Sequence, residues 1–234
     1  MEFRCLFHLH TRHSFDSLLS PHKIVARARE LKIDALIVTD HNTLKGSLVT
    51  KQASQGNPPL VIAAAEYQSE KGDIIGLFLR EEIRSRESNE IIRQIHEQGG
   101  LVVLPHPHKG HKLDDQLLSA VDMIEIFNSR CSPEENNRAR QLAEKWKLPG
   151  IAGADAHCYP ELGTALNEYS GTYPENEAEL RTLLLHAPRK FITQIASPLW
   201  RPYSQLIKAV KTRNADLFLY QTKRLVLALA GRKR

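Results

Sequence analysis

The sequence predicts an α/β protein in which helices surround a parallel sheet or barrel. Apolar runs rich in β-branched residues alternate with helical patterns along the chain, which is typical of that class. Most of the predicted strands also pass into side chains of the kinds that bind metals. Because the carboxyl ends of parallel strands form one rim, these side chains are expected to meet at the mouth of a barrel. The 234 residues suffice for one sizeable domain.

The predicted elements follow one another in a regular order, since strand and helix periods take turns. Strands are expected at residues 3–10, 34–41, 59–66, 73–79, 100–107, 123–128 and 150–157. Helices are expected between them at residues 21–31, 43–53, 89–98 and 133–146. Ser20 before Pro21 is a favourable start for the first helix, and Gly99 and Gly100 end the third.

The C-terminal segment differs from the rest in charge. From Arg201 onward, nine basic residues face one acidic residue, a net charge of +8, so the preceding residues carry about −3 of the total +5. We therefore predict a main domain at residues 1–198 and a basic helical extension at residues 199–234. The extension is expected to pack its apolar face on the domain with its charges in water, or to bind an acidic partner or nucleic acid.

Targeting and redox signals are few. The N-terminus lacks the pattern of a secretory signal, and no window approaches 18 uninterrupted apolar residues, so a cytoplasmic protein without a membrane span is expected. Cys5, Cys131 and Cys158 are odd in number and lack CxxC spacing. They predict neither a disulfide framework nor a zinc site made of thiolates.

The residues that carry chemistry are imidazoles and carboxylates. His8 and His10 stand two apart on a predicted strand, so both side chains should point to one side and grip one ion. Asp40 is expected to orient its neighbours. Similar groups end the other strands: His41, Glu66, His106, Asp155 and His157. Such a cluster would repel itself without cations, and mixed nitrogen and oxygen ligands favour Zn, Mn or Fe.

The motifs in these segments resemble the polymerase and histidinol phosphatase (PHP) superfamily of metal-dependent phosphoesterases. They are "HLHTRHSFDS", "TDHNT", "AAEYQ", "LPHP", "EIFNSR" and "GADAH", which occur in the family's order within residues 3–195. The stretch "ELGTALNEYSGTYPENEAELRTLLL" also resembles a C-terminal element of the family. The resemblance implies a distorted seven-stranded (β/α) barrel whose mouth holds two or three divalent metal ions.

The resemblance also implies a ligand set. It assigns His8, His10, Glu66 and Asp155 to the first ion, Glu66 and His106 to the second, and Asp16, His41 and His157 to the third. A metal-bound hydroxide would then attack phosphorus, with no side-chain nucleophile. Asp73 stands where many relatives place a histidine ligand of the second ion, which would shift the preference toward Mn. Leu6 stands where relatives commonly carry an aspartate.

Three further residues are candidates for substrate binding. Arg130 follows "EIFN" and its planar guanidinium suits a bidentate phosphate contact, although a salt bridge within the domain is the alternative. Lys109 and His111 lie in a loop beyond a ligand-bearing strand, where substrate contact competes with a solvated loop.

The function that these residues predict is metal-dependent hydrolysis of a phosphate ester, with a small phosphorylated metabolite or nucleotide as substrate. One alternative is a nuclease acting on short RNA or DNA ends, whose backbone the basic extension would contact. Another is a metal-stabilised binding module without turnover, which the departures at Asp73 and Leu6 keep open. A histidinol-phosphate phosphatase is a further possibility by family analogy.

Overall fold

The computed structural model describes residues 2–171 and 173–230. Its strands are β1 (Glu2–Leu9), β2 (Ala35–Val38), β3 (Leu60–Val61), β4 (Ala64–Ser69), β5 (Gly72–Leu77), β6 (Leu101–Leu104), β7 (Met123–Asn128), β8 (Gly150–Ala156), β9 (Ala165–Ser170) and β10 (Arg189–Thr193). Its α-helices are α1 (Pro21–Glu30), α2 (Lys45–Ser54), α3 (Ser88–Glu97), α4 (Asp115–Ala120), α5 (Pro133–Trp146), α6 (Glu177–His186), α7 (Trp200–Lys211) and α8 (Ala215–Ala230).

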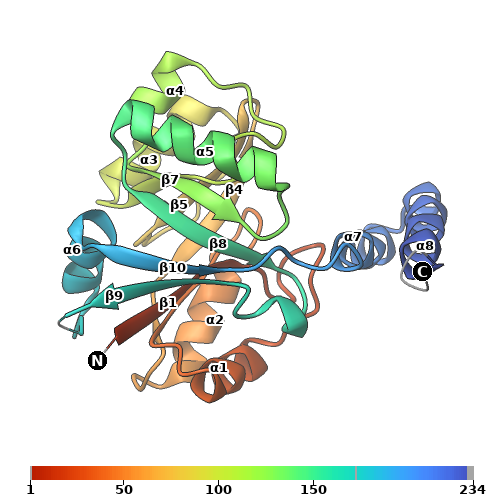
Figure 1. The fold of residues 1–234 in the computed structure, drawn as a ribbon, viewed down its shortest axis with the longest axis horizontal. Coiled ribbons are helices and arrows are strands. Elements are labelled where there is room, and N and C mark those ends of the chain that lie inside the picture. The colour runs from red at the N-terminus through yellow and green to blue at the C-terminus, as the bar shows by residue number, and fades with distance from the viewer. Residues whose placement is uncertain (1, 172, 231–234) are drawn as a thin grey trace.

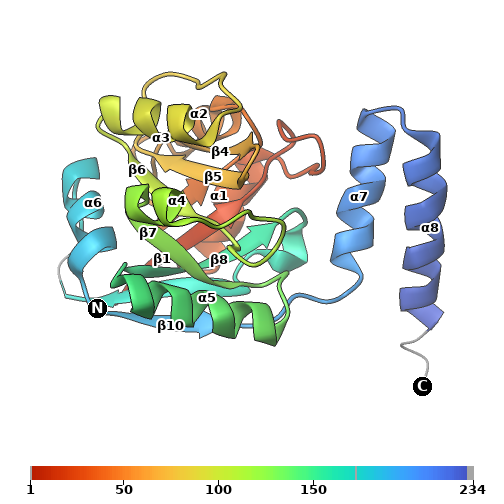
Figure 2. The ribbon, with the colours of Figure 1, turned by 90° about the horizontal axis from the view of Figure 1, so that it is seen from above.

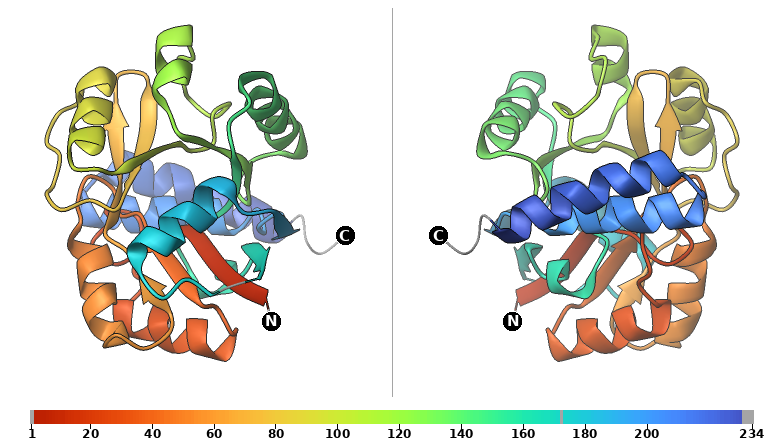
Figure 3. Two further views of the ribbon diagram at one scale, coloured as in Figure 1. Left: turned by 90° about the vertical axis from the view of Figure 1, so that its left-hand side faces the viewer. Right: turned by 90° about the vertical axis from the view of Figure 1, so that its right-hand side faces the viewer.

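The strands form one curled, half-barrel sheet, with helices α1 to α5 on its outside (Figures 1 and 3). Strand β1 pairs in parallel with β2 and β8, and the sheet continues from β8 through β7, β6 and β5 to β4. Strand β2 pairs with β3, which only two residues separate from β4. An isolated parallel bridge between His41 and Glu66 also links the segment after β2 to β4. The predicted α/β class is thus confirmed. A distorted seven-stranded barrel was expected, and the described strands form a curled half barrel of ten strands.

Not every strand is parallel. Only two residues, Glu70 and Lys71, join β4 to β5, and such a short link forces an antiparallel hairpin because a parallel pair needs a long crossover. Strand β5 is therefore also antiparallel to β6. At the other side of the sheet, β9 pairs antiparallel with both β1 and β10.

The core lies on both faces of the central strand. Cys5 and Phe7 of β1 belong to one buried apolar cluster, whereas Leu6 and Leu9 belong to another. A strand covered on both faces reads as a continuous apolar run, as β1 does. Cys5, like the two other cysteines, is buried and not in a disulfide.

The C-terminal segment is helical, as expected. Helices α7 and α8 pack side by side at one end of the barrel, with α7 nearer the barrel and α8 outside it (Figure 2). Ile207 is buried, but Val210 is 64% exposed, so the expected apolar contact is only partly made. Residues 231–234 lie outside the described residues, and the boundary at residue 199 stays a prediction. No described helix is long and apolar enough to span a membrane.

Candidate metal centre

The expected ligands meet at one end of the curled sheet, where β1, β2, β4, β6 and β8 end and the antiparallel β5 begins. They come from β1, β2, β4, β5, β6 and β8 or from the residues just after these strands, and from the loop after β1. A cavity of about 290 Å³ is lined by Asp16, His41, Glu66, Asp73, His106, Asp155 and His157. His8 and His10 are fully buried.

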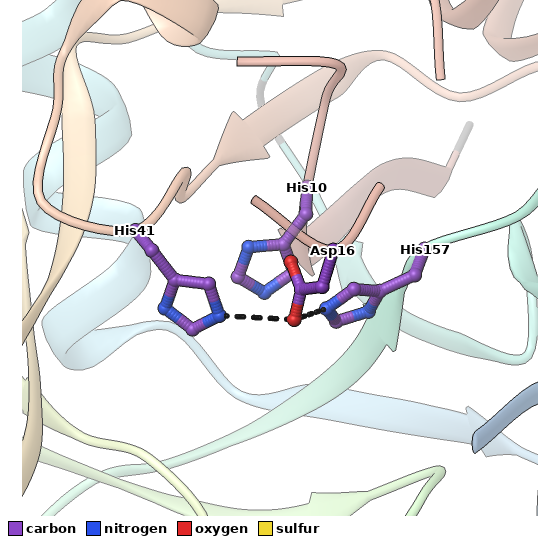
Figure 4. Close-up of side chains that lie close together, drawn as sticks. All are labelled: His10, Asp16, His41 and His157. Atoms are coloured by element: carbon purple, nitrogen blue, oxygen red, sulfur yellow. Dashed lines mark hydrogen bonds and ion pairs between the residues drawn. The ribbon is translucent and has the colours of Figure 1, made fainter. Parts of the chain in front are cut away.

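The ligand atoms form three overlapping groups, in each of which all atoms lie within 4.8 Å of one another. The groups are His8, His10 and Asp155; His8, Glu66 and His106; and His10, Asp16, His41 and His157. Figure 4 shows the last group. This partition differs from the one implied by the family in two ways. Glu66 joins only the group with His8 and His106, and His8 and His10 are each shared between two groups.

Glu66 lies between the groups. Its Oε1 is 3.4 Å from His8 Nε2 and 3.2 Å from His106 Nε2. Its Oε2 is 3.6 Å from His10 Nε2 and 3.1 Å from His41 Nδ1. The two oxygens of one carboxylate therefore face different imidazoles, which is the arrangement that a carboxylate bridging two ions requires.

Asp16 and Asp155 complete the carboxylates of the centre. Asp16 Oδ2 lies 3.0 Å from His157 Nε2 and 3.4 Å from His41 Nε2, as the dashed lines in Figure 4 show. Asp155 Oδ1 lies 3.5 Å from His10 Nε2. Each carboxylate thus faces ring nitrogens that are in position to share an ion with it.

Asp40 organises the loop that presents Asp16. Its carboxylate accepts hydrogen bonds from the backbone N–H and the hydroxyl of Thr11, both at 2.6 Å, and from Ser14 Oγ at 2.7 Å. Ser14 Oγ in turn accepts a hydrogen bond from the backbone N–H of His41. Asp40 is therefore engaged in positioning and is absent from the three ligand groups found among the described residues.

The unpaired atoms of these side chains fit bound cations. His8 Nε2, His10 Nε2 and Asp16 Oδ1 are buried without a hydrogen-bond partner among the described residues. Leaving such atoms unpaired costs about 1–3 kcal/mol each. Nitrogen and oxygen donors that converge without thiolates suit a divalent ion, so the residues fit the metal ions that the sequence predicts.

Three of the candidate ligands depart from regular strand geometry. His8, His106 and Asp155 have φ angles of 63°, 27° and 49°, a left-handed region that costs a non-glycine residue about 1–2 kcal/mol. His8 is the extra residue of a bulge, since Phe7 and Leu9 pair with two consecutive residues of β2. The bulge, rather than the regular alternation expected from the sequence, aims the His8 ring.

Glu125 of β7 is a site residue that the sequence analysis missed. This fully buried carboxylate accepts hydrogen bonds from His8 Nδ1 at 2.8 Å, from the backbone N–H of His106 at 2.7 Å and from Asn128 Nδ2 at 3.0 Å. Gly153 leaves it room, because a Cβ there would stand 1.6 Å from Glu125 Oε1. The sequence did offer a signal for Glu125, because a carboxylate in the middle of the apolar run "MIEIFN" needs buried hydrogen-bond partners.

Replacing Glu125 by glutamine is expected to weaken metal binding by about 10–100-fold. Glutamine has one acceptor oxygen, so its NH₂ group would face either the His8 Nδ1–H or the His106 N–H, both of which donate. Competition with a chromophoric chelator measures the affinity. The exposed Glu134→Gln is the matched control, and an unchanged affinity in Glu125→Gln would contradict this role.

The buried carboxylates stay ionised despite their burial. Burial raises the pKa of Glu66, but the charges of His8 and His41 outweigh it and hold that pKa well below its usual range. Burial likewise raises the pKa of Asp155, and Lys109 with His8 outweighs it and lowers that pKa. Both groups are therefore available as anionic ligands at neutral pH.

The imidazoles divide into two kinds. Burial, with the neighbouring His157 and His41, lowers the pKa of His10 to about 3, so this ring is neutral and ready to bind an ion. Burial would lower the pKa of His41 too, but Glu66 and Asp16 outweigh it and raise that pKa to about 9. An ion that binds His41 at neutral pH must therefore displace a proton.

Metal affinity is accordingly expected to rise with pH up to about 9, by about tenfold per unit for each displaced proton. Below the raised pKa of His41 the protonated ring competes with the ion, and above it this competition ends. Chelator competition from about pH 6 to 9 measures the slope. His41→Ala should flatten it and the exposed His22→Ala should not. A plateau near pH 7 would contradict the prediction.

The remaining predicted residues lie at the edge of the centre or outside it. Asp73 Oδ2 is 4.0 Å from His106 Nε2, and Asp73 joins none of the three groups among the described residues. Lys109 lines the cavity, with its Nζ 3.5 Å from Asp155 Oδ2. His111 donates a hydrogen bond from Nε2 to the carbonyl oxygen of Asp73 and is absent from the described cavity lining.

Arg130 lines the cavity but is already engaged. Its Nε and Nη2 donate to the two carboxylate oxygens of Glu161, both at 2.7 Å. Its Nη1 donates to Ser204 Oγ at 3.0 Å, and Nη2 also approaches the carbonyl oxygen of Trp200 at 3.4 Å. The geometry matches the salt bridge that was the alternative to a phosphate contact.

Fold and centre together define a mixed α/β protein with buried groups of potential metal ligands at the strand ends. Residues 7–73 match the model of the PHP domain, and residues 133–185 match that of the PHP-associated region. An uncharacterized protein of Methanocaldococcus jannaschii is 34% identical over 136 residues, covering 52% of this chain and 80% of the relative. A second protein of that organism is 33% identical over 162 residues, covering 63% and 66%. The chain belongs to the PHP domain family, as its motifs suggested.

Solved structures share the fold. A two-domain protein from Bacteroides vulgatus, described as containing a predicted PHP-like metal-dependent phosphoesterase, superposes with a TM-score of 0.69 at 17% identity. The match covers 83% of this chain but 65% of that one, so the chain spans about two thirds of that protein. PsfC from Pseudomonas syringae superposes with a TM-score of 0.66 at 16% identity, covering 89% and 98%. At these identities the likeness establishes the fold alone.

Proposed function

We propose that this protein is a metal-dependent phosphoesterase that hydrolyses small phosphate esters. The observation that carries the proposal is the position of Glu66, whose two oxygens face imidazoles of different ligand groups. Two or three divalent ions held there would lower the pKa of a bound water and polarise the phosphoryl oxygens. Mn, Zn and Fe suit the mixed ligands, and Asp73 at the edge favours Mn.

The residues of the chain supply the positions and the electrostatics. The described lining of the cavity contains no serine, threonine or cysteine, which agrees with hydrolysis without a side-chain nucleophile. Cys131 lies nearby, but burial raises its pKa to about 12 and keeps it a thiol. Lys109, with its Nζ near Asp155, is in place to contact a phosphate oxygen at the same wall.

The test is hydrolysis of simple phosphomonoesters, histidinol phosphate, nucleoside bisphosphates and short oligonucleotides by the protein loaded with Mn, Zn or Fe. Turnover that chelator removes, that metal restores and that His106→Ala loses would support the proposal. The exposed His22→Ala is the matched control. If the metals bind and no ester is hydrolysed, the proposal fails and a metal-stabilised binding module becomes the better account.

A further inference from the structure

The C-terminal helices form a roof over the metal centre. Five side chains from α7 and α8 line the same cavity as the metal ligands: Arg201, Gln205, Lys208, Gln221 and Arg224. Figure 3 (right) shows the two helices crossing the end of the barrel. The cavity therefore has one wall of imidazoles and carboxylates and an opposing set of cationic and amide side chains.

The roof is fixed to the centre by specific contacts. Lys211, the last residue of α7, donates hydrogen bonds from Nζ to the carbonyl oxygens of Arg12, Ser14 and Ser17, at 2.9, 2.6 and 2.7 Å. These three carbonyls belong to the loop that carries Asp16. All three N–H donors of the ammonium group are thus used to hold α7 against the loop that presents a metal ligand.

The cations of the roof lack anionic partners. No ion pair or side-chain hydrogen bond is found for Arg201, Lys208 or Arg224 among the residues that the structure describes. Arg201 and Arg224 are exposed, Lys208 is half-buried, and the Arg224 guanidinium lies 5.9 Å from the centre of the Tyr220 ring. Lys208 Nζ lies 4.6 Å from the centre of the Phe15 ring, and this ring stacks on His41 with 4.5 Å between centroids. One aromatic ring therefore separates the Lys208 charge from a predicted metal ligand.

Gln221 of α8 independently points to a ligand. Its side chain lines the cavity and is only 5% exposed, yet its Oε1 has no hydrogen-bond partner among the described residues. A buried amide oxygen without a donor is costly, so a hydroxyl or a water held by the ligand would satisfy it.

We infer that the roof recognises a second anionic group of the substrate, a carboxylate or a second phosphate, in addition to the phosphate that is hydrolysed. This inference rests on the proposed function, because the reacting phosphate is assigned to the metal wall and leaves the roof cations unpaired. A cavity of about 290 Å³ suits a small molecule. The substrate class is therefore a small phosphate ester that carries a further negative charge.

The experiment compares matched pairs of esters with the metal-loaded full chain. The first pair is glycerol 1-phosphate and 3-phosphoglycerate, and the second is fructose 6-phosphate and fructose 1,6-bisphosphate. In each pair the second ester carries the extra anion, so the two pairs distinguish a carboxylate from a phosphate. The ratio of kcat/KM within a pair is expected to favour the more charged ester by about tenfold or more.

Lys208→Ala and Arg224→Ala are expected to reduce that ratio by about tenfold each, because each removes one charged partner of the second anion. Lys223→Ala is the matched control, since it removes a charge from an exposed position of α8 outside the described cavity lining. Equal losses on both members of a pair, or a wild-type protein without preference, would overturn the inference. Roof-dependent cleavage of short oligonucleotides without any preference within the pairs would also overturn it.

A failure of the proposed function has a different signature. If no ester is turned over, calorimetric titration of the metal-loaded protein with each member of the first pair still tests the roof. Tighter binding of 3-phosphoglycerate that Lys208→Ala abolishes would support the inference without turnover. Equal binding of both esters would overturn it.

Discussion

Glu66→Gln is expected to lower kcat by about 10³-fold or more, because in the proposed phosphoesterase the metal ions would contribute several kcal/mol of charge stabilisation. The carboxylate is 1% exposed and faces the ring nitrogens of His8, His10, His41 and His106. Glutamine keeps the shape but supplies one neutral oxygen and an NH₂ group, which cannot bind an ion.

Two measurements distinguish a loss of bound metal from unfolding of the Glu66→Gln protein. Elemental analysis of the purified Glu66→Gln protein should show fewer bound ions per chain, while circular dichroism stays that of the wild type. Glu81→Gln, at an exposed position, should change neither the metal content nor the rate. Full turnover by Glu66→Gln with its metals in place would rule out a bridging role for this residue.

Arg130→Met is expected to reduce the free energy of unfolding by about 3–5 kcal/mol, because it leaves the buried carboxylate of Glu161 without a cationic partner. The side chains of Arg130 and Glu161 are 6% and 0% exposed, and the pair is bidentate. Glu161 also accepts hydrogen bonds from the backbone N–H groups of His157 and Cys158, so it is fixed in place and has no route to water.

Denaturant unfolding measures this loss, and a double variant tests its cause. Arg130→Met with Glu161→Gln removes the stranded charge but keeps an acceptor for the two backbone N–H groups, so it should recover part of the lost stability. A loss of less than about 1 kcal/mol in Arg130→Met would place the pair among weak surface contacts. Arg130 also holds Ser204 of α7, so limited proteolysis of the variant should cut more readily near residue 199.

The local patterns of the sequence predicted most of the barrel. Strands β1, β2, β6, β7 and β8 are short apolar runs with helices before or after them, and all take part in parallel pairs. The direction of β5 was not predicted, because it depends on a two-residue link rather than on the strand's own composition. Strand β10 lies at the sheet edge and β9 lies between it and β1, and both strands contain polar residues and lack a strong apolar pattern.

The candidate ligands were predictable because they are strong metal donors, and most of them lie at or just after the end of an apolar strand. Eight of the nine predicted ligands fall into the three groups, and Asp73 stands at the edge. Glu125 was missed because it acts on His8 from another strand, 117 positions away in the chain. The positions of α7 and α8 could not be predicted from the sequence either, because the basic charge of this segment does not indicate which loop Lys211 contacts.

The left-handed backbone at His8, His106 and Asp155 has a consequence for protein design. A histidine–x–histidine sequence copied onto an ideal strand would present two rings in the usual alternation, without the bulge that turns His8 toward Glu66 and Asp155. A transplanted centre would therefore need the irregular pairing of β1 with its neighbours as well as the ligands. In this fold the two-residue spacing of the histidines places both rings in the centre only together with the bulge in β1.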